Sequence, residues 1–166
     1  AIPHLAFSKQ MDRQPASESQ TVYNSEIGKC LKLTDGIGEC ANLNHADLNT
    51  KRLQAQNLKG ANLKNAQLVL ADLGSAKLQG VDLRFARLEG AFLVGIQMDT
   101  FTQIYGAQFD KFTVLPNEWG ETVEARRKEA LRKGLVFVEP PYDFYHPVGP
   151  QLRDSWVVHQ RRRLLY

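Results

Sequence analysis

The sequence lacks several features that would quickly assign it to a class of protein. Its 166 residues contain two cysteines, too few for a dense disulfide scaffold or a four-thiolate zinc site. No segment approaches the roughly 18 consecutive apolar residues of a membrane-spanning helix, so we expect no such helix. Charge of neither sign dominates, because 21 Lys and Arg against 18 Asp and Glu give a net charge of +3. What remains is a globular chain of about one domain.

Motifs for catalysis and cofactor binding are also missing. The sequence has no Gly-rich phosphate loop, Gly-x-Ser-x-Gly elbow, HExxH helix or calcium loop. Its four histidines are scattered along the chain, at His4, His45, His146 and His159. We therefore expect no catalytic residue, no cofactor and no metal site.

Leucine, in contrast, is abundant and regularly placed in the middle of the chain. Eleven of the 21 leucines follow one another at a strict spacing of five: Leu43, Leu48, Leu53, Leu58, Leu63, Leu68, Leu73, Leu78, Leu83, Leu88 and Leu93. Met98 continues the series, and Ile104, Phe109 and Val114 resume it one residue late, which predicts one inserted residue after Met98. Because an internal repeat determines the fold of the region that contains it, we infer the fold of this region from the leucine pattern.

The five-residue unit has a consistent chemistry. The position two before each leucine is alanine in nine of fifteen units, and the residue between them is usually polar, as in ANLNH and ADLNT. A period of five fits neither the 3.6 of a helix nor the 2.0 of a flat strand. It fits a short extended piece followed by a two-residue corner, where Gly60, Gly80, Gly90 and Gly95 supply freedom for a positive φ.

These units resemble the pentapeptide-repeat proteins, whose consensus is A(D/N)LXX. The resemblance covers residues 41–115 and implies an all-β fold, a right-handed quadrilateral β-helix of just under four coils. Lys51, Gln56, Ile96 and Phe112 depart from the small inward residue of the consensus. We expect the Lys51 amine to reach solvent at the end of the stack, because an unpaired buried charge is costly.

Both ends of such a solenoid need covering. Residues 22–40 lack clean pentapeptides and are interpreted as an N-terminal cap or degenerate first coil, after an N-terminal extension at 1–21. Residues 116–134 predict a C-terminal capping α-helix, with Trp119, Val123, Ala130 and Leu131 as its apolar face. We expect residues 135–166 to be an extended tail, because this segment begins with a short β-like stretch and continues rich in Pro, aromatic residues and Arg.

The two cysteines bracket the N-terminal cap, and two interpretations stay open. A Cys30–Cys40 disulfide would close a small loop and indicate an oxidising compartment. Alternatively, both are small buried thiols of a cytoplasmic protein. The first residue is Ala, as in a processed mature protein, which favours an extracytoplasmic location such as the periplasm or an organelle or thylakoid lumen.

Candidate interaction residues are outward-facing apolar residues and the tail. Val69, Leu70, Phe85, Phe92 and Val94 occupy positions that ought to be polar, and Phe85 and Phe92 are the strongest of them. In the tail we select aromatic and arginine residues, the types that interface hot spots favour: Tyr142, Phe144, Tyr145, Trp156, Arg161, Arg162 and Arg163. The tail either binds a partner or folds back on the solenoid.

The function that follows is a non-enzymatic structural or adaptor protein, an accessory subunit held in a larger assembly through its tails. We expect its partners to be proteins, and peripheral contact with a membrane complex is compatible with this role. Nucleic-acid binding is not expected, since the surface charge is mixed. The alternative implied by the resemblance is a DNA-mimicking regulator of DNA gyrase, which the short, slightly basic solenoid disfavours. An enzyme would need a site between tail and solenoid, built from His146 with Asp143 or His159 with Asp154.

Overall fold

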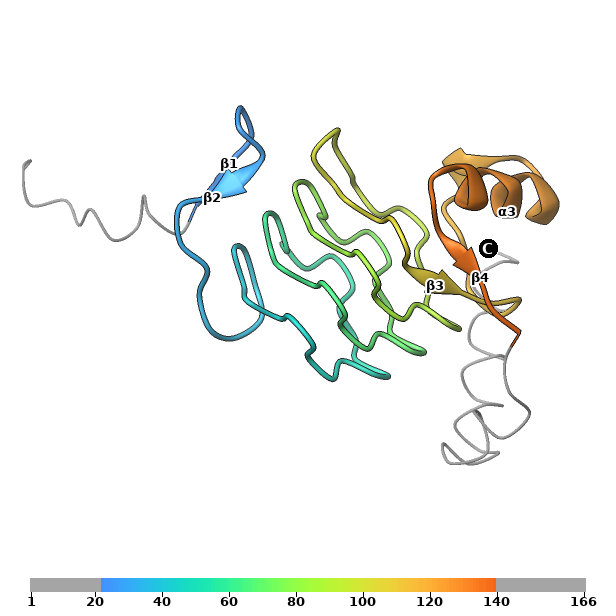
Figure 1. Ribbon diagram of the computed structural model, residues 1–166, viewed down its shortest axis with the longest axis horizontal. Coiled ribbons are helices and arrows are strands. Elements are labelled where there is room, and N and C mark those ends of the chain that lie inside the picture. Colours follow the sequence, from blue (N-terminus) through green and yellow to red (C-terminus); the bar gives the residue numbers. More distant parts are fainter. Residues whose placement is uncertain (1–21, 140–166) are drawn as a thin grey trace, which may run out of the picture.

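Successive stretches of about twenty residues stack on one another in the structure, a computed structural model that describes residues 22–139 (Figure 1). Parallel bridges join Asn42 to Asn62 and Asn62 to Asp82, and three further columns repeat the same offset, so four pentapeptides make one coil. The chain is therefore a solenoid of the β-helix type. Its coils are joined mostly by single bridges, which is why few residues are formally in strands.

The regular elements lie at the two ends of the stack. In chain order they are β1 (Tyr23–Asn24), β2 (Lys29–Cys30), β3 (Gln108–Phe109), the 3-10 helix η1 (Asn117–Trp119), α3 (Val123–Arg132) and β4 (Val136–Phe137). β1 pairs with β2 in an antiparallel manner, and β3 pairs with β4 in parallel. No helix within residues 22–139 has the length and apolar character needed to cross a membrane.

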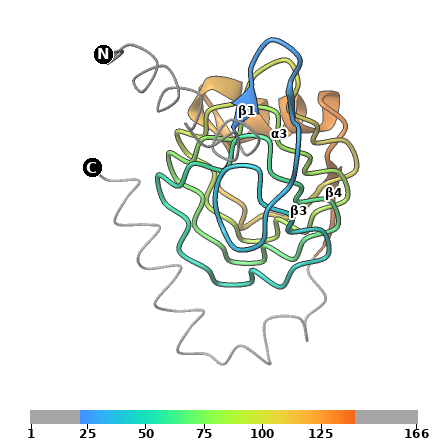
Figure 2. The ribbon, with the colours of Figure 1, turned by 90° about the vertical axis from the view of Figure 1, so that its left-hand side faces the viewer.

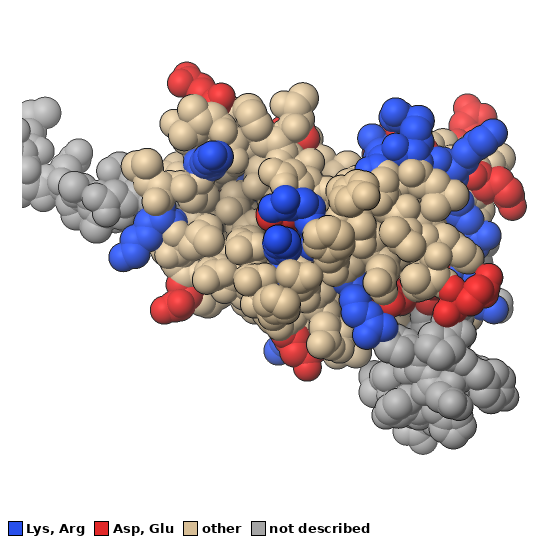
Figure 3. All heavy atoms as spheres, in the orientation of Figure 1, with Lys and Arg blue, Asp and Glu red and all other residues tan. Residues whose placement is uncertain are grey.

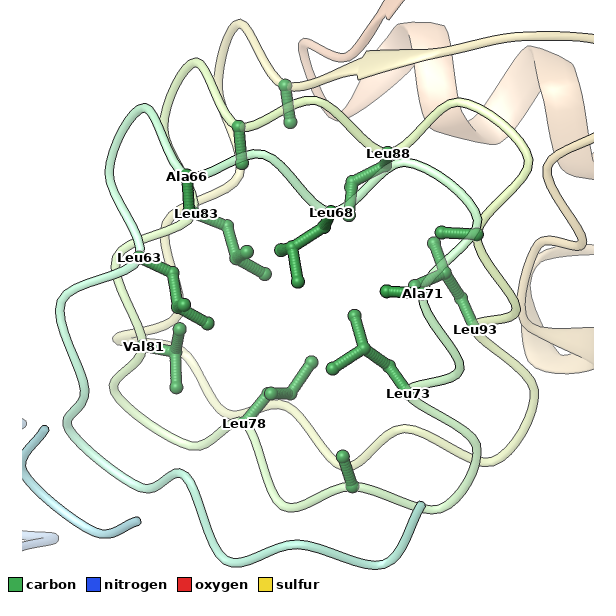
Figure 4. Packing of buried hydrophobic residues seen from close by; sticks show 14 of the residues in the cluster. Leu63, Ala66, Leu68, Ala71, Leu73, Leu78, Val81, Leu83, Leu88 and Leu93 are labelled. Carbon is green, nitrogen blue, oxygen red and sulfur yellow. The ribbon is translucent and has the colours of Figure 1, made fainter. Parts of the chain in front are cut away.

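The leucines of the repeat fill the interior, as the spacing predicts. Leu58, Leu63, Leu68, Leu73 and Leu78 are fully buried, and for the last four the buried alanine two positions earlier leaves room for the leucine. Figure 4 shows the side chains of Leu63, Leu68, Leu73 and Leu78 pointing toward one another from the sides of the coil. At the N-terminal end, Lys51 is exposed, as expected for a charge that escapes the stack.

Each corner is closed by backbone hydrogen bonds that the period of five makes possible. The Ala61 N–H donates to the Leu58 oxygen at 2.9 Å within the coil, while the Gly60 N–H donates to the Gln79 oxygen at 2.8 Å in the next. The last corner residue adopts a positive φ whether it is Gly60 (69°) or Phe85 (60°). Stacking therefore satisfies the backbone at the corners as well as on the flat sides.

The repeat contains two inserted residues where the sequence predicts one. Bridges change from an offset of 20 at Lys77↔Gln97 to 21 at Asp82↔Gln103, and then to 22 at Phe92↔Val114. The first insert, residues 99–102, is the expected one; the second, residues 110–113, is not. The predicted inward position of Val114 is wrong, since Leu115 is buried (4% exposed) in its place. For the same reason Phe112 lies outside the small inward position and is 37% exposed.

The N-terminal residues confirm one of the two cysteine interpretations, because Cys30 and Cys40 form a disulfide with their Cα atoms 5.8 Å apart. Cys40 occupies a corner of the solenoid, with its N–H donating to the Lys59 oxygen at 2.9 Å. From Cys30 the chain loops over the end of the first coil (Figure 2). The disulfide thus ties the β1–β2 hairpin to the first corner of the repeat.

The C-terminal end carries a helix, as predicted, but it packs differently. Thr122 caps α3 by accepting from the Ala125 N–H at 3.1 Å. Ala130 is fully buried in the core cluster, whereas Val123 and Leu131 are each 52% exposed, so their assignment to the buried face is wrong. The chain then returns as β4 along β3, at the edge of the last coil.

Candidate interaction surface

One corner of the solenoid presents aromatic and basic side chains together, and we call Lys64, Arg84, Phe85 and Tyr105 the aromatic corner. Lys64, Arg84 and Tyr105 stack in successive coils, since the Asn65 N–H bonds to the Arg84 oxygen and the Phe85 N–H to the Tyr105 oxygen. Phe85 is 47% exposed and Tyr105 is 66% exposed. Their ring centroids are 6.2 Å apart in an edge-to-face arrangement. Large aromatic surface is therefore held in fixed geometry and open to solvent.

Glycines make this arrangement possible. A Cβ at Gly106 would overlap the Phe85 ring, and a Cβ at Gly134 would lie 2.8 Å from Tyr105 Cδ2. The Lys64 ammonium lies 6.0 Å from the centre of the Phe85 ring, within reach of a cation–π contact. Each ring therefore lies over the glycine of the next segment.

A surface hollow of about 370 Å³ adjoins the aromatic corner. Its lining comes from the corner, the first insert and the end of α3: Arg84, Met98, Asp99, Thr102, Gln103, Ile104, Tyr105 and Lys133. The charges at its rim are paired, because Arg84 contacts Asp82 at 2.8 Å and Lys133 contacts Glu129 at 3.4 Å. The face in Figure 3 shows Lys and Arg side chains near its middle and around α3, separated by uncharged surface.

Ion pairing sets the protonation of these carboxylates. Burial raises the pKa of Asp82, but the Arg84 guanidinium outweighs it and holds that pKa below its usual range. The Arg132 hydrogen bond lowers the pKa of Glu129 to about 2. Both acids are charged at neutral pH, so neither can serve as a general acid there.

Hydrogen bonds join the first insert to the N-terminal hairpin. The Tyr23 hydroxyl donates to Asp99 Oδ2 at 2.6 Å, and the Gly80 N–H donates to Asp99 Oδ1 at 3.0 Å. Burial raises the pKa of Asp99, yet the bonds from Tyr23 and from nearby backbone N–H groups outweigh it and hold that pKa low. Burial, together with the neighbouring carboxylate, raises the pKa of Tyr23. The contact therefore joins a neutral phenol to a charged carboxylate.

Three carboxylates are buried along another edge of the solenoid: Asp72, Glu89 and Asp110. Asp72 Oδ1 accepts from the Gly74 N–H at 2.9 Å, and Asp110 Oδ1 accepts from the Gly90 N–H at 3.0 Å, so both organise the backbone. Burial raises the pKa of Glu89 despite its ion pair with Arg87 at 3.1 Å. No three His, Cys, Asp or Glu side chains in the described part of the chain converge as metal ligands would.

Several predicted interaction residues have a clear position in the structure. Phe85 is exposed, whereas Phe92 is only 7% exposed, so its expected outward exposure is wrong. The Phe92 ring folds over Gly74, whose missing Cβ would lie 3.0 Å from it. Val69 and Leu70 are likewise buried, at 4% and 5% exposed.

The remaining predicted residues lie outside the described residues: Tyr142, Phe144, Tyr145, Trp156, Arg161, Arg162 and Arg163, together with the His146–Asp143 and His159–Asp154 pairs. Sequence reasoning missed Tyr105, Tyr23 and Asp99. For Asp99 the available signal was the repeated pattern Asp-x-Phe-Thr, which occurs as DTFT at 99–102 and DKFT at 110–113.

A family model matches the repeat region of this chain. The family model for pentapeptide repeats matches residues 39–74 and 66–99, with eight copies. A pentapeptide repeat protein of Nostoc PCC 7120 is 26% identical over 81% of this chain and 95% of its own, with a TM-score of 0.41. Rfr23 of Cyanothece 51142 is 31% identical over 48% of this chain and 67% of its own, with a TM-score of 0.32.

A pentapeptide repeat protein of the Arabidopsis thaliana thylakoid lumen is 29% identical over 58% of this chain and 77% of its own, with a TM-score of 0.30. No curated protein matches the sequence.

Proposed function

Because this chain belongs to the pentapeptide-repeat family, we propose that it is a non-enzymatic adaptor that binds another protein through the aromatic corner. The exposed pair of Phe85 and Tyr105 carries the proposal. Aromatic side chains contribute much of the energy at protein interfaces, and a rigid support lowers the entropy lost on binding. The stacked coils provide that support.

The finer description extends the same proposal. The solenoid is a right-handed quadrilateral coil of just under four turns, and the protein serves as an accessory subunit of a larger assembly. The Cys30–Cys40 disulfide supports an oxidising, extracytoplasmic compartment, since such bonds persist where thiols are not kept reduced. Gyrase regulation by DNA mimicry is not favoured, because it requires a dominant negative charge and this chain has a net charge of +3.

The test is affinity purification from the native source with wild type and two variants. The double variant Phe85→Ala/Tyr105→Ala removes the aromatic corner, and Ile37→Ala removes a residue of similar exposure (49%) at the opposite end. We expect one or more proteins to be retained by wild type and Ile37→Ala, and to bind the double variant at least tenfold more weakly. Identical recovery with all three proteins would refute a role for the aromatic corner.

A further inference from the structure

The last coil ends in an unpaired sheet edge on the side that carries Gln103. One coil earlier, the Leu83 N–H donates to the Gln103 oxygen at 2.7 Å, and the Gln103 N–H donates to the Val81 oxygen at 2.9 Å. The corresponding groups of the last coil are the Ile104 N–H and the Thr102 oxygen, and neither forms a hydrogen bond within residues 22–139. We call these two groups the open edge. They provide one donor and one acceptor at the spacing of a parallel bridge.

On the neighbouring side of the same coil, the chain covers the edge itself. β4 pairs there with β3 in parallel (Figure 1). The Val136 N–H donates to the Ala107 oxygen at 2.8 Å, as a further coil would. Addition of one strand is therefore how this protein closes one side of the stack. The side at Ile104 receives no such strand from the part of the chain that the structure describes.

Apolar side chains lie beneath the open edge. Ile104 and Met98 occupy inward positions of the last coil, yet they are only partly buried. Leu78 and Leu83, at the same positions one coil earlier, are 0% and 2% exposed. Both Ile104 and Met98 line the surface hollow of about 370 Å³. An apolar side chain that enters this hollow would cover them, as the inward leucine of a further coil would.

Two cations at the rim of the hollow keep donors available. Glu129 accepts from the Arg132 guanidinium at 2.6 and 2.7 Å, so its ion pair with Lys133 is the longer one, at 3.4 Å. Arg84 binds Asp82 through its Nε and Nη2 atoms, and its Nη1 forms no hydrogen bond with a described residue. Since an ammonium has three N–H donors and a guanidinium five, both cations can bind a further carboxylate.

The acidic side chain in the lining, Asp99, has its oxygens already engaged. Oδ1 accepts from the N–H groups of Gly80, Phe101 and Thr102, and Oδ2 accepts from the Tyr23 hydroxyl. These bonds direct the charge of Asp99 toward the first insert and the N-terminal hairpin. The hollow is therefore apolar at its floor and has cationic donors at its rim.

We propose that the open edge binds an extended segment of a partner protein, in which carboxylates flank an apolar residue. The segment runs parallel to the edge, accepts a hydrogen bond from the Ile104 N–H and donates one to the Thr102 oxygen. Its apolar side chain covers Ile104 and Met98, and a carboxylate binds Arg84 or Lys133. In this mode, backbone hydrogen bonds supply affinity and the side chains select the partner. The inference rests on the proposed adaptor function for the partner being a protein, and adds the class of segment recognised.

The first measurement is amide exchange in the free full-length protein, followed by NMR at several protein concentrations. The Ile104 N–H should exchange about 100-fold faster than the Leu83 N–H, which is hydrogen bonded at the same position one coil earlier. Slow exchange of Ile104 at every concentration would show that the chain covers its own edge. Slow exchange only at high concentration, with a dimer in size-exclusion chromatography, would assign the edge to a second copy. Either result would overturn the proposal.

The second measurement titrates the full-length protein with a ten-residue peptide, two copies of ADLEG. Binding should slow exchange of the Ile104 N–H. The dissociation constant should rise about tenfold when serine replaces the leucines, because apolar burial is lost. It should rise by a similar factor when the aspartate amides are N-methylated, because the donor to the Thr102 oxygen is lost. Equal affinity for all three peptides would overturn the proposal.

A matched pair of protein variants tests the charge at the rim. Lys133→Gln should weaken binding of the ADLEG peptide about threefold. Lys128→Gln removes an exposed cation from the same helix, away from the hollow, and should leave the affinity unchanged. Equal effects of the two variants would refute a role for the rim.

The outcomes for this inference and for the adaptor function are distinguishable. A native partner that is lost in Phe85→Ala/Tyr105→Ala, with no binding of the ADLEG peptide, would keep the adaptor function and overturn the inference. Peptide binding that passes these controls would support the open edge, even where native purification recovers no protein.

Discussion

The disulfide should control whether the N-terminal hairpin stays docked, and its contribution follows from the structure. Cys30 and Cys40 are ten residues apart, and a cross-link of that length removes about 2.7 kcal/mol of chain entropy from the open state. Replacing both cysteines by alanine should therefore raise the equilibrium constant for hairpin opening about 100-fold. Because the hairpin rests on the outside of the corner at Gly60 and Gly80, the coils beneath it should keep their own stability.

Hydrogen exchange followed by mass spectrometry separates these effects. Peptides covering residues 22–30 should exchange about 100-fold faster in the double alanine variant, and in wild type treated with a reductant, while peptides covering residues 63–93 should not change. Unchanged exchange in 22–30 would show that Tyr23 and Phe101 hold the hairpin without the disulfide. Equal acceleration in both regions would show that hairpin and solenoid unfold as one unit, and either result would refute the reasoning.

Three further predictions concern the core, the hairpin contact and one corner. Leu78→Ala should lower the free energy of unfolding by about 3–5 kcal/mol in urea titrations, since Leu78 is fully buried. Tyr23→Phe should weaken hairpin docking by about 1–2 kcal/mol at pH 7 in hydrogen exchange. The lowered pKa of Asp99 means that this difference is lost as pH falls below about 4, and the raised pKa of Tyr23 means that it is lost again above about 10. Gly80→Ala should release the hairpin, whereas Gly36→Ala, at a similar positive φ with open space around it, should cost only about 1 kcal/mol in thermal unfolding.

The period of five was enough to predict the solenoid, because each leucine has the same local task. Every fifth side chain must point inward and every corner must turn, so the fold is determined by residues that are neighbours in sequence. The positive φ at Gly60 and Gly80 follows from the same reasoning. A fold that is determined by neighbouring residues can be predicted without knowing which distant residues are in contact.

The sequence did not predict the second insert, because two adjacent residues near it are both apolar. Val114 and Leu115 are both apolar, so a five-residue step from Phe109 reaches an acceptable residue although the chain has slipped by one. The bridge between Phe92 and Val114 and the burial of Leu115 reveal the slip. When two consecutive residues are both apolar, the periodicity of the sequence does not show which of the two points inward.

The candidate interaction surface depends on contacts that have no local pattern. Tyr23 and Asp99 are 76 residues apart, and nothing near either residue indicates the other. Phe92 was expected to face solvent because the repeat position is polar, yet the glycine at position 74 of the preceding coil gives its ring a place to lie. Exposure at an outward position therefore depends on the residue one coil away, which a single pentapeptide does not contain.

The inserts show how a rigid repeat acquires individual features without losing its core. At a regular corner, a backbone carbonyl of the next coil accepts the N–H of the last corner residue, as at Gly60. At the inserts the aspartate side chain accepts that N–H instead, at Gly80 and at Gly90. The lengthened corner therefore satisfies the glycine N–H by another route, and the coils continue to stack at offsets of 21 and 22. In the first insert, the aspartate and threonine satisfy the local backbone, and Phe101 between them lies against Gly28 of the N-terminal hairpin, so this insert holds the N-terminal end of the described chain on the solenoid.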